Sequence, residues 1–489
     1  MKISFVQHLL PTAEGCHLGH STIDTLSDDA LLCIFDSYRR DSESGGMWPW
    51  GDLVHVCQRW RRIIFAFPGC LDLRLGCKSK TDVQAAIDIW PALPLSISAT
   101  LNVENTDEDD IIGALEHRGR IAGIHLRKFN HSQLKKCVAL IEKPFPALKT
   151  LYLKADRKTR FVHTGSVALL GGSAPLLQWI HLYGIQFPSL PKLLSSTSDL
   201  VRLDLEDIPM TGEGHISPDA MATCLSVLTK LRSLTIVFLE QRPSHYPTDQ
   251  HPPPSTHTVL PALVDLGLEG PHGYLEDLVG RLDAPLLKSG FLQSYDEPIF
   301  DTPRVPQFIH STKMFKLLGE VKVSFYKGSI TTCFCSLISP AVFFLSLPCS
   351  GLPSQVTIME RICAQWPPLV SHVGFLKLDD LFIQVEKWWE AVTPWLGFLR
   401  LFTAVQTLRL RGTAPVSHVA RMLGELEGER ATEILPALRI IEVDCSEQRA
   451  SRILCLLGSF LVAREDLGRP VVVNIGSKFC LPSTAHAFF

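Results

Sequence analysis

Apolar residues return along most of the chain in one short pattern, L-x-x-L-x-L, in which other aliphatic residues replace some of the leucines. The alternation within each copy predicts a short β-strand with one buried face and one exposed face. Successive copies begin 23 residues apart at the closest (Leu177 to Leu200) and 33 residues apart at the widest (Val405 to Leu438). The copies begin at Ile121, Leu148, Leu177, Leu200, Leu231, Leu263, a degenerate Leu287, Leu318, Val342, Val373, Val405 and Leu438. One such unit cannot bury its own apolar face, so the pattern predicts units that stack on one another.

The segments between these copies carry a second pattern, with apolar residues at helical spacing. Four such segments are Asp107–Arg118, Ser132–Ile141, Ser217–Leu228 and Tyr274–Leu282. A strand followed by a helical or irregular return segment at this period is the signature of leucine-rich repeats. We therefore predict an α/β fold in which residues 71–480 form an irregular leucine-rich-repeat solenoid with a curved parallel sheet. Leu71–Leu75 and Leu95–Leu101 are predicted to be ragged opening units.

Two stretches interrupt the predicted array, and two tails flank the ordered part of the chain. Residues 242–261 are rich in proline and predict an exposed loop inserted between repeats. Residues 388–402 hold three tryptophans, which favour a helix packed on its neighbours over an aromatic binding patch. We predict that residues 1–24 form a disordered N-terminal tail and that residues 481–489 form a C-terminal tail.

Residues 328–359 carry no charged side chain. An uncharged stretch of this length is long enough to cross a bilayer as a helix. Its three prolines and many hydroxyl side chains oppose a membrane span, and Val342 and Leu345 fit the strand pattern. We expect a repeat unit here, with a membrane span or an error in the gene model as the alternatives.

Residues 25–70 precede the array and carry the pattern of two short amphipathic helices. Ser27, followed by two aspartates, suits a helix start, because it offers a side-chain oxygen and negative charge to the free amides. One face of the first helix holds Leu31, Ile34, Phe35 and Tyr38. The stripe of the second helix holds Leu53, Val56, Cys57, Trp60, Ile64 and Phe67. Pro68 ends this helix, and the polar, glycine-rich residues 39–51 predict a hinge between the two.

This hairpin resembles an F-box at Leu26, at the run Leu31–Phe35 and at the V-x-x-C-x-x-W-R run Val54–Arg61. An F-box docks a substrate adaptor onto a cullin-type ubiquitin ligase through the Skp subunit. The resemblance implies that Skp-binding residues are Leu26, Leu31, Leu32, Ile34, Phe35, Val54, Cys57 and Trp60. The chain departs from the family at Ser27, where proline is usual, and in its longer hinge. An ordinary helical hairpin that caps the array remains the alternative.

The order of an F-box followed by irregular leucine-rich repeats resembles the large F-box families of mushroom-forming (basidiomycete) fungi. Phrases typical of that group are LVHVCQRWRRIIFAFP, SPDAMATCLSVLTKLRSL, YLEDLVGRLDAPLL and FTAVQTLRL. The resemblance covers most of the chain after Leu26, and residues 328–359 fit it least well. It implies a substrate-recognition adaptor of a cullin-type (SCF) E3 ubiquitin ligase. The F-box would bind the Skp subunit and through it a cullin, and the repeats would bind a substrate protein.

Composition and charge narrow the class of partner. Hydrophobic residues make up 46% and charged residues 20% of the 489-residue chain, which suffices for a buried core along most of its length. The formal net charge is -3, so the chain lacks the concentrated basic charge that nucleic acids and anionic membranes require. The 14 cysteines are scattered without a C-x-x-C pair, which opposes a disulfide framework or a zinc site. We expect a reducing compartment, the cytoplasm or the nucleus.

Motifs for catalysis or cofactor binding are weak throughout the sequence. Gly212–Gly214 lacks the lysine of a phosphate-binding loop, and Gly171–Ser173 does not complete a nucleophile elbow. His17 and His20 form an isolated H-x-x-H without further metal ligands. We accordingly predict no enzymatic activity, no cofactor and no metal site.

The residues between the buried positions of each strand offer a binding surface for a substrate protein. Candidates on this face are Tyr152, Trp179, His181, Tyr183, Arg202 and Arg409. Trp179, His181 and Tyr183 are the strongest, because aromatic side chains are enriched where proteins bind one another. A solvated sheet face is the alternative for these three. A second hypothesis for the whole protein is a leucine-rich-repeat scaffold or recognition protein whose N-terminal hairpin is only a cap.

Overall fold

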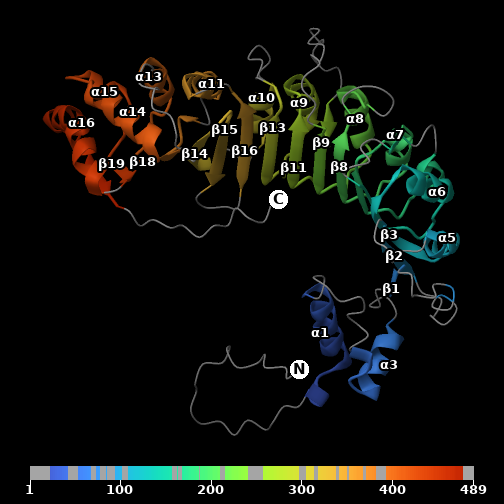
Figure 1. Ribbon diagram of the computed structural model, residues 1–489. Helices are drawn as coiled ribbons and strands as arrows, with labels where there is room; N and C mark the ends of the chain where they lie inside the picture. The colour runs from blue at the N-terminus through green and yellow to red at the C-terminus, as the bar shows by residue number, and fades with distance from the viewer. Residues whose placement is uncertain are drawn as a thin grey trace, which may run out of the picture.

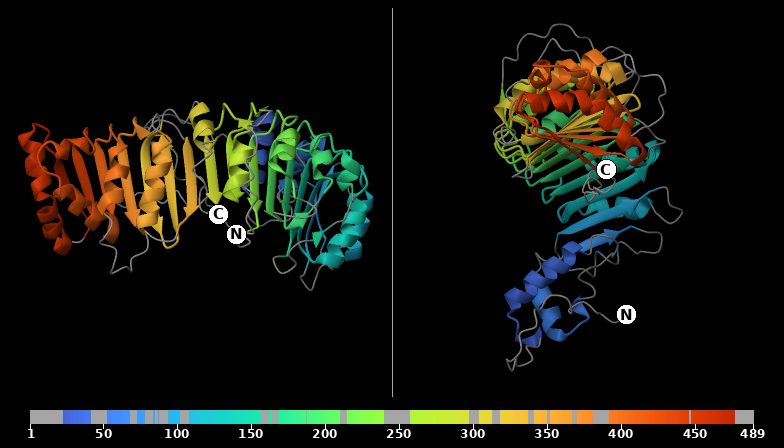
Figure 2. Two further views of the ribbon diagram at one scale, coloured as in Figure 1. Left: turned by 90° about the horizontal axis from the view of Figure 1, so that it is seen from above. Right: turned by 90° about the vertical axis from the view of Figure 1, so that its left-hand side faces the viewer.

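A computed structural model describes residues 23–41, 53–67, 73–77, 84, 87, 94–101, 108–156, 162–163, 168–186, 188–209, 215–239, 257–296, 304–312, 318–336, 341–349, 352–366, 370–380, 392–445 and 447–476. These residues form one long sheet with helices along one side, and a helical hairpin lies beyond the N-terminal end of the sheet (Figures 1 and 2). The predicted tails 1–24 and 481–489 and the predicted loop 242–261 fall largely or wholly outside the described residues.

The hairpin consists of α1 (Asp28–Asp41) and α3 (Gln58–Ala66), preceded by the short helix η1 (Ile23–Thr25). The predicted start of α1 is confirmed, because the Ser27 hydroxyl accepts a hydrogen bond from the amide of Ala30 at 3.2 Å. Arg59 ties the two helices together: its Nη2 donates to Asp28 Oδ1 at 2.7 Å and to the Leu26 carbonyl at 2.6 Å. The hairpin is therefore held by a charged clamp in addition to its apolar interior.

The second predicted helix begins later than its apolar stripe suggests. Cys57 has extended backbone angles (φ -157°, ψ 169°) and caps α3, with its sulfur accepting from the amide of Trp60 at 3.4 Å. The predicted stripe from Leu53 to Phe67 was therefore wrong as a single face. Because the helical phase restarts after the cap, Ile63 and Ile64 point inward, whereas Val56 and Phe67 are exposed.

The sheet has sixteen strands among the described residues, and neighbouring strands run parallel except where β15 takes part. In spatial order they are β1 (Leu73–Gly76), β2 (Leu95–Thr100), β3 (Ile121–Phe129), β4 (Thr150–Ala155), β6 (Trp179–Tyr183), β8 (Arg202–Ile208), β9 (Ser233–Phe238), β11 (Asp265–Gly270), β13 (Ser289–Ser294), β16 (Val342–Pro348), β15 (Ser329–Ser336), β14 (Leu318–Tyr326), β17 (Phe375–Asp380), β18 (Thr407–Arg411), β19 (Ile440–Asp444) and β20 (Val472–Ile475). Two short parallel pairs flank this sheet: β5 (Val162–His163) with β7 (Ile185–Gln186), and β10 (Thr258–Val259) with β12 (Leu282–Asp283). Every copy of the leucine pattern overlaps a strand of this sheet, which confirms a leucine-rich-repeat-type solenoid.

The return segments supply helices on one side of the sheet (Figure 2). They are α5 (Glu108–Glu116), α6 (His131–Ile141), η4 (Leu169–Gly172), α7 (Leu190–Leu194), α8 (Pro218–Leu225), α9 (His272–Val279), α10 (Arg304–Ser311), α11 (Leu352–Ala364), α13 (Val392–Arg400), α14 (Thr413–Gly424), α15 (Arg430–Glu433) and α16 (Glu447–Asp466). The four helices predicted from apolar spacing correspond to α5, α6, α8 and α9. Trp395 on α13 is buried against Phe325 and Phe398, which confirms core packing for that tryptophan. The other two tryptophans of residues 388–402 lie outside the described residues.

The core of the array is built from rows of aliphatic side chains that run across the strands. Leu151, Ile180 and Leu203 are register partners on consecutive strands, and all three are fully buried. Burial of one such side chain stabilises the fold by roughly 1.5–3 kcal/mol. Because each row continues into the next repeat, the stability of one unit depends on its neighbours.

The chain departs from simple stacking between β13 and β17. Leu318 and Val342 were predicted to begin successive repeats, but β16 pairs with β13 and β14 pairs with β17, so their spatial order is reversed. β15 lies between them and is antiparallel to both. We call β14, β15 and β16 the reversed meander. The prediction failed because β14 and β16 carry the same apolar pattern, and the antiparallel β15 has no leucine at the buried positions.

The reversed meander also explains the uncharged residues 328–359. Those of them that the structure describes lie in or next to β15, β16 and the first part of α11, so they belong to the sheet and its helical layer. Among the described residues, no helix has both the length and the apolar character that a membrane crossing requires.

Gly290 and Phe343 fit each other at the junction of β13 with the reversed meander. They are register partners, and a methyl group on Gly290 would lie 2.4 Å from the Phe343 ring. The repeat at Leu287 is therefore degenerate for a physical reason: glycine replaces the middle aliphatic residue and makes room for a large ring.

Gly290→Ala should lower the free energy of unfolding by about 1–3 kcal/mol, because the added methyl overpacks the junction. Gly267→Ala on the neighbouring β11 is the matched control, since its nearest contact is 3.6 Å away, and it should change stability by less than about 1 kcal/mol. Urea unfolding followed by circular dichroism measures both. Gly290→Ala combined with Phe343→Leu should recover part of the loss, and equal effects of the two glycine substitutions would contradict the overpacking explanation.

Candidate functional site

The face of the sheet opposite the helices, here called the open face, carries the residues that alternate with the buried aliphatic positions. From β3 to β8 the strand register places His125 beside Tyr152, Tyr152 beside His181, and His181 beside Asp204. Trp179 and Tyr183 flank His181 on β6. We call His125, Tyr152, Trp179, His181 and Tyr183 the aromatic patch.

The rings of the aromatic patch stack on one another across three strands. The Tyr152 and His181 rings are parallel within 4°, with centroids 4.3 Å apart. His125 continues the row at 6.1 Å from Tyr152, and Trp179 meets the edge of Tyr152 at the same distance. Such contacts fix ring orientation and contribute on the order of 1 kcal/mol each beyond area burial. The patch is therefore an ordered surface.

Asp204 on β8 anchors one side of the patch. Its Oδ2 accepts hydrogen bonds from Trp179 Nε1 at 3.1 Å and from Arg202 Nε at 2.6 Å. His181 Nδ1 lies 3.6 Å from the same oxygen. Burial alone would raise the pKa of Asp204, but the bonds from His181, Arg202 and Trp179 outweigh it and lower that pKa below its usual value.

Three cations lie over the rings of the patch. Arg127 is 5.0 Å from the centroid of Tyr152, Lys154 is 4.2 Å from that of Tyr183, and Arg202 is 5.6 Å from that of Trp179. Cation–π contacts of this kind are worth roughly 0.5–2 kcal/mol and hold the long side chains in place. The patch thus presents an ordered aromatic surface with the hydrogen-bond donors of Arg127, Lys154 and Arg202 around it.

Two buried polar atoms have no hydrogen-bond partner among the described residues. They are Nε2 of His181, which belongs to the patch, and Oδ1 of Asp204, which anchors it. Asp204 is 1% exposed and His181 is 8% exposed. Buried polar atoms without partners are costly and mark places where a bound group or an ordered water is accommodated. The patch therefore combines aromatic contact area with unused hydrogen-bonding capacity.

The structure brings together five of the six predicted substrate-face residues, and Arg409 is the exception. Arg409 lies on β18, where its guanidinium bonds Glu442 at 2.5 Å and lies 5.3 Å from the Phe375 ring. His125 and Arg127 also lie on this face and were not among the residues predicted from the sequence. The same alternation that identified Tyr152 applies to the strand Ile124–Arg127, so the signal for both residues was present.

The predicted Skp-binding residues divide by exposure. Leu31, Phe35 and Val54 are buried in the hairpin, so their side chains stabilise it and offer no contact surface. Leu26, Leu32 and Trp60 are partly buried, and Ile34 and Cys57 are exposed. Exposed apolar side chains of the hairpin are Ile23, Ile34, Tyr38, Val56, Phe65 and Phe67. Phe65 was missed because it lies off the predicted stripe.

In the part of the chain that the structure describes, the open face carries neither a metal-ligand cluster nor a complete set of catalytic side chains. No group of three or more histidine, cysteine, aspartate or glutamate side chains is placed to hold a metal ion. His181 and Asp204 resemble two members of an acid–base relay, but His181 Nε2 contacts no described nucleophile. The geometry favours recognition of a partner.

Comparisons with known proteins assign neither a family nor a function to this chain. No family model matches the chain, and no curated protein matches it. One similar solved structure is the leucine-rich repeat-containing protein LegL7 from Legionella pneumophila, 9% identical over 85% of this chain and 94% of that chain, with a TM-score of 0.24. Another is TLR13 in its complex with ssRNA13, 13% identical over 84% of this chain and 66% of that chain, with a TM-score of 0.22. TM-scores this low support no conclusion about this chain. The fold is established by the chain's own repeats and strand pairing.

Asp204→Asn should lower the free energy of unfolding at pH 7 by about 1–3 kcal/mol, because the carboxylate orders Trp179 and Arg202. The folded-state pKa of Asp204 lies below its unfolded value, so the carboxylate stabilises the fold above about pH 4 and this contribution is lost as the pH falls further. The gap between wild type and Asp204→Asn should therefore narrow below pH 4.

Glu206→Gln is the control for this experiment, since Glu206 is 3.7 Å from His181 and more exposed than Asp204. Its effect on unfolding should stay within about 0.5 kcal/mol. A gap between wild type and Asp204→Asn that is unchanged down to pH 3 would contradict the anchoring role.

Proposed function

We propose that the protein is a substrate-recognition adaptor of a cullin-type ubiquitin ligase. Its hairpin would bind the Skp subunit, and its aromatic patch would bind a substrate protein. The observation that carries the docking half is the placement of exposed apolar side chains. Six of the fifteen large apolar side chains that are exposed among the described residues lie on residues 23–41 and 53–67. Exposed apolar groups at this density are typical of protein interfaces.

The hairpin supports docking by a helix-in-groove mode. Ile34 is 43% exposed and Val56 is 57% exposed, and both lie within the sequence runs that resemble an F-box. Leu31, Phe35 and Trp60 hold the two helices together, with the Phe35 and Trp60 rings 4.8 Å apart. In this proposal the buried residues shape the hairpin and the exposed ones enter the groove of the partner.

The array supports the substrate half of the proposal. The aromatic patch lies on strands β3, β4 and β6, near the hairpin end of the sheet (Figure 1). A substrate held there would be kept close to the ubiquitin-charged enzyme, so the adaptor would act by effective concentration and would need no chemistry of its own. The fungal resemblance and a reducing compartment, cytoplasm or nucleus, belong to the same proposal, and the free cysteines of the described residues are consistent with it.

Ile34→Asp and Phe65→Asp should each weaken binding to a purified Skp subunit by at least about tenfold, because each places a charge in an apolar contact. Val462→Asp on α16 is the control: Val462 is 60% exposed and distant in the fold, and its substitution should leave affinity within about twofold. Isothermal titration calorimetry measures the affinities, and far-UV circular dichroism verifies the helices. Wild-type affinity in both hairpin variants would refute docking through this surface.

The second candidate function is a leucine-rich-repeat scaffold whose hairpin is only a cap. It is favoured by one observation: the buried residues of the hairpin belong to the same continuous apolar core as Leu75 of β1 and the repeats beyond it.

Removal of residues 1–70 distinguishes the two functions. A docking module should come away with less than about 2 °C change in the melting temperature of the array, whereas loss of a cap exposes the first repeat and should lower it by more than about 5 °C. Differential scanning calorimetry gives both values. A drop of more than about 5 °C in the melting temperature, together with no affinity of the full chain for Skp, would favour the scaffold.

A further inference from the structure

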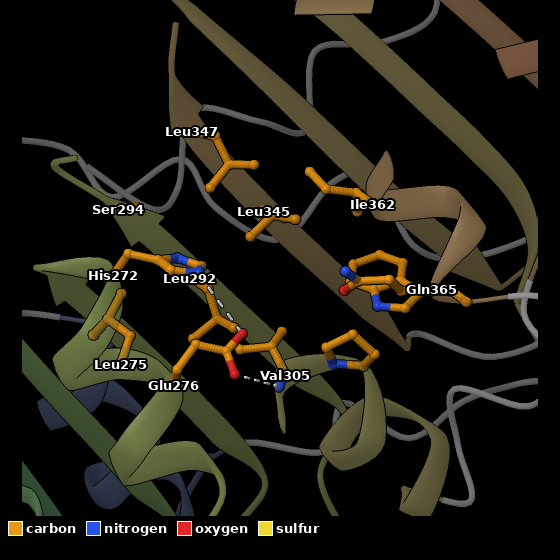
Figure 3. A pocket seen from close by; sticks show the side chains of 12 residues that line it. His272, Leu275, Glu276, Leu292, Ser294, Val305, Leu345, Leu347, Ile362 and Gln365 are labelled. Carbon is orange, nitrogen blue, oxygen red and sulfur yellow. Dashed lines mark hydrogen bonds and ion pairs between the residues drawn. The ribbon is translucent and has the colours of Figure 1, made fainter. Parts of the chain in front are cut away.

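The junction of β13 with the reversed meander contains a cavity of about 40 Å³ on the helix side of the sheet (Figure 3). Its lining comes from α9, β13, α10, β16, α11 and the turn after α11. We call it the seam cavity. It lies on the opposite side of the sheet from the aromatic patch, so it is separate from the proposed substrate surface.

The seam cavity exists because the chain order is broken there. α10 follows β13 and α11 follows β16, so the two helices over these neighbouring strands are separated in the sequence by the reversed meander. Leu292 of β13 and Leu345 of β16 are register partners that lie side by side on the sheet, and Val305 and Ile362 close the sides (Figure 3). Most of the wall is aliphatic, and the space is left between the two repeats.

Trp366 gives the cavity an unused hydrogen-bond donor. Its side chain lines the cavity and is 4% exposed, and its Nε1 has no hydrogen-bond partner among the described residues. A buried indole N–H normally finds an acceptor, because leaving it unpaired costs on the order of 1–3 kcal/mol. The cavity therefore favours an occupant with an acceptor atom.

Glu276 is the carboxyl group at the cavity wall, and its oxygens already have hydrogen-bond and ion-pair partners within the protein. Its Oε2 accepts from the amides of Arg304 and Val305 at 2.9 and 3.2 Å, and its Oε1 lies 3.8 Å from His272 Nε2. Burial raises the pKa of Glu276 to about 7 despite these bonds. An environment that disfavours its own carboxylate also disfavours a charged occupant.

We propose that the seam cavity binds the end of a small neutral molecule in which a hydrogen-bond acceptor, such as a carbonyl oxygen, adjoins a short apolar group. The acceptor would take the Trp366 indole N–H, and the apolar group would lie among Leu292, Leu345 and Ile362. One water needs roughly 10–15 Å³ of such space, so the cavity of about 40 Å³ holds about three or four non-hydrogen atoms. A larger ligand would extend outward from the cavity.

The probe for this proposal is 2-butanone, a neutral ketone of suitable size, added to the full chain. Saturation-transfer difference NMR should show saturable binding, with an affinity on the order of millimolar because so few atoms make contact. Leu345→Phe and Ile362→Phe fill the cavity from different elements, and each should weaken binding at least about tenfold. Val462→Phe adds the same bulk at an exposed site of α16 and should leave binding unchanged.

Trp366→Phe tests the hydrogen bond, because it keeps an aromatic wall and removes the donor. It should weaken 2-butanone binding about three- to tenfold, the range expected for one neutral hydrogen bond. Butylammonium, a cation of similar length, should not show saturable binding. Circular dichroism and melting curves of each variant establish that the fold is retained.

Several results would overturn the proposal. Binding that does not saturate, or that is equal in wild type and in both folded cavity-filling variants, means that the ketone does not occupy the cavity. Equal binding to Trp366→Phe removes the assigned acceptor chemistry. No ketone binding, together with a water contact at the Trp366 indole proton in wild type, means that the cavity is a water site. None of these results bears on docking to Skp, which involves other residues.

Discussion

Every part of this molecule depends on the stacking of one repeat's aliphatic row on the next. Parallel strands about 4.8 Å apart bring register partners into van der Waals contact, so a leucine in one unit is buried by the leucine beside it. Leu203 between Ile180 and Leu234 is a typical case, with all three fully buried. No unit is stable alone, and the register is set by the need to continue each row.

The same register creates the candidate site on the other face. Once the aliphatic rows are aligned, the alternating positions are aligned too, and Tyr152, His181 and Asp204 become neighbours without any contact having been specified locally. Asp204 then orders Trp179 and Arg202, and the stacked rings orient one another. The packing of the core and the arrangement of the candidate site are consequently two results of one constraint, since the strands that carry the aromatic patch are held by the buried residues behind them.

Short-range sequence patterns predicted the individual strands and helices but not the order in which the strands pair. Period-two alternation located the strands, and helical spacing located α5, α6, α8 and α9, because both signals depend only on near neighbours in sequence. Cys57 could not be identified as a cap from its apolar stripe, since the cap consists of its extended backbone and the bond from the Trp60 amide to its sulfur, which the stripe does not encode. The spatial order of β14 and β16 is non-local, and their patterns are interchangeable. Tyr152, Trp179 and Tyr183 were found by alternation, whereas the unpaired donor of Trp366 emerges only from the complete packing.

The reversed meander has a consequence for how the chain assembles during synthesis. When β14 leaves the ribosome, β13 has an unpaired edge, and β14 has the right direction and the right apolar pattern to join it. The native partner, β16, is made later, and the correct arrangement requires β14 to remain off that edge until the antiparallel turns with β15 have formed. Gly290 helps to discriminate, because its missing side chain leaves space that the ring of Phe343 fills and that Val321 of β14 would leave partly empty. The degenerate repeat at Leu287 thus favours β16 over β14 as the strand that pairs with β13.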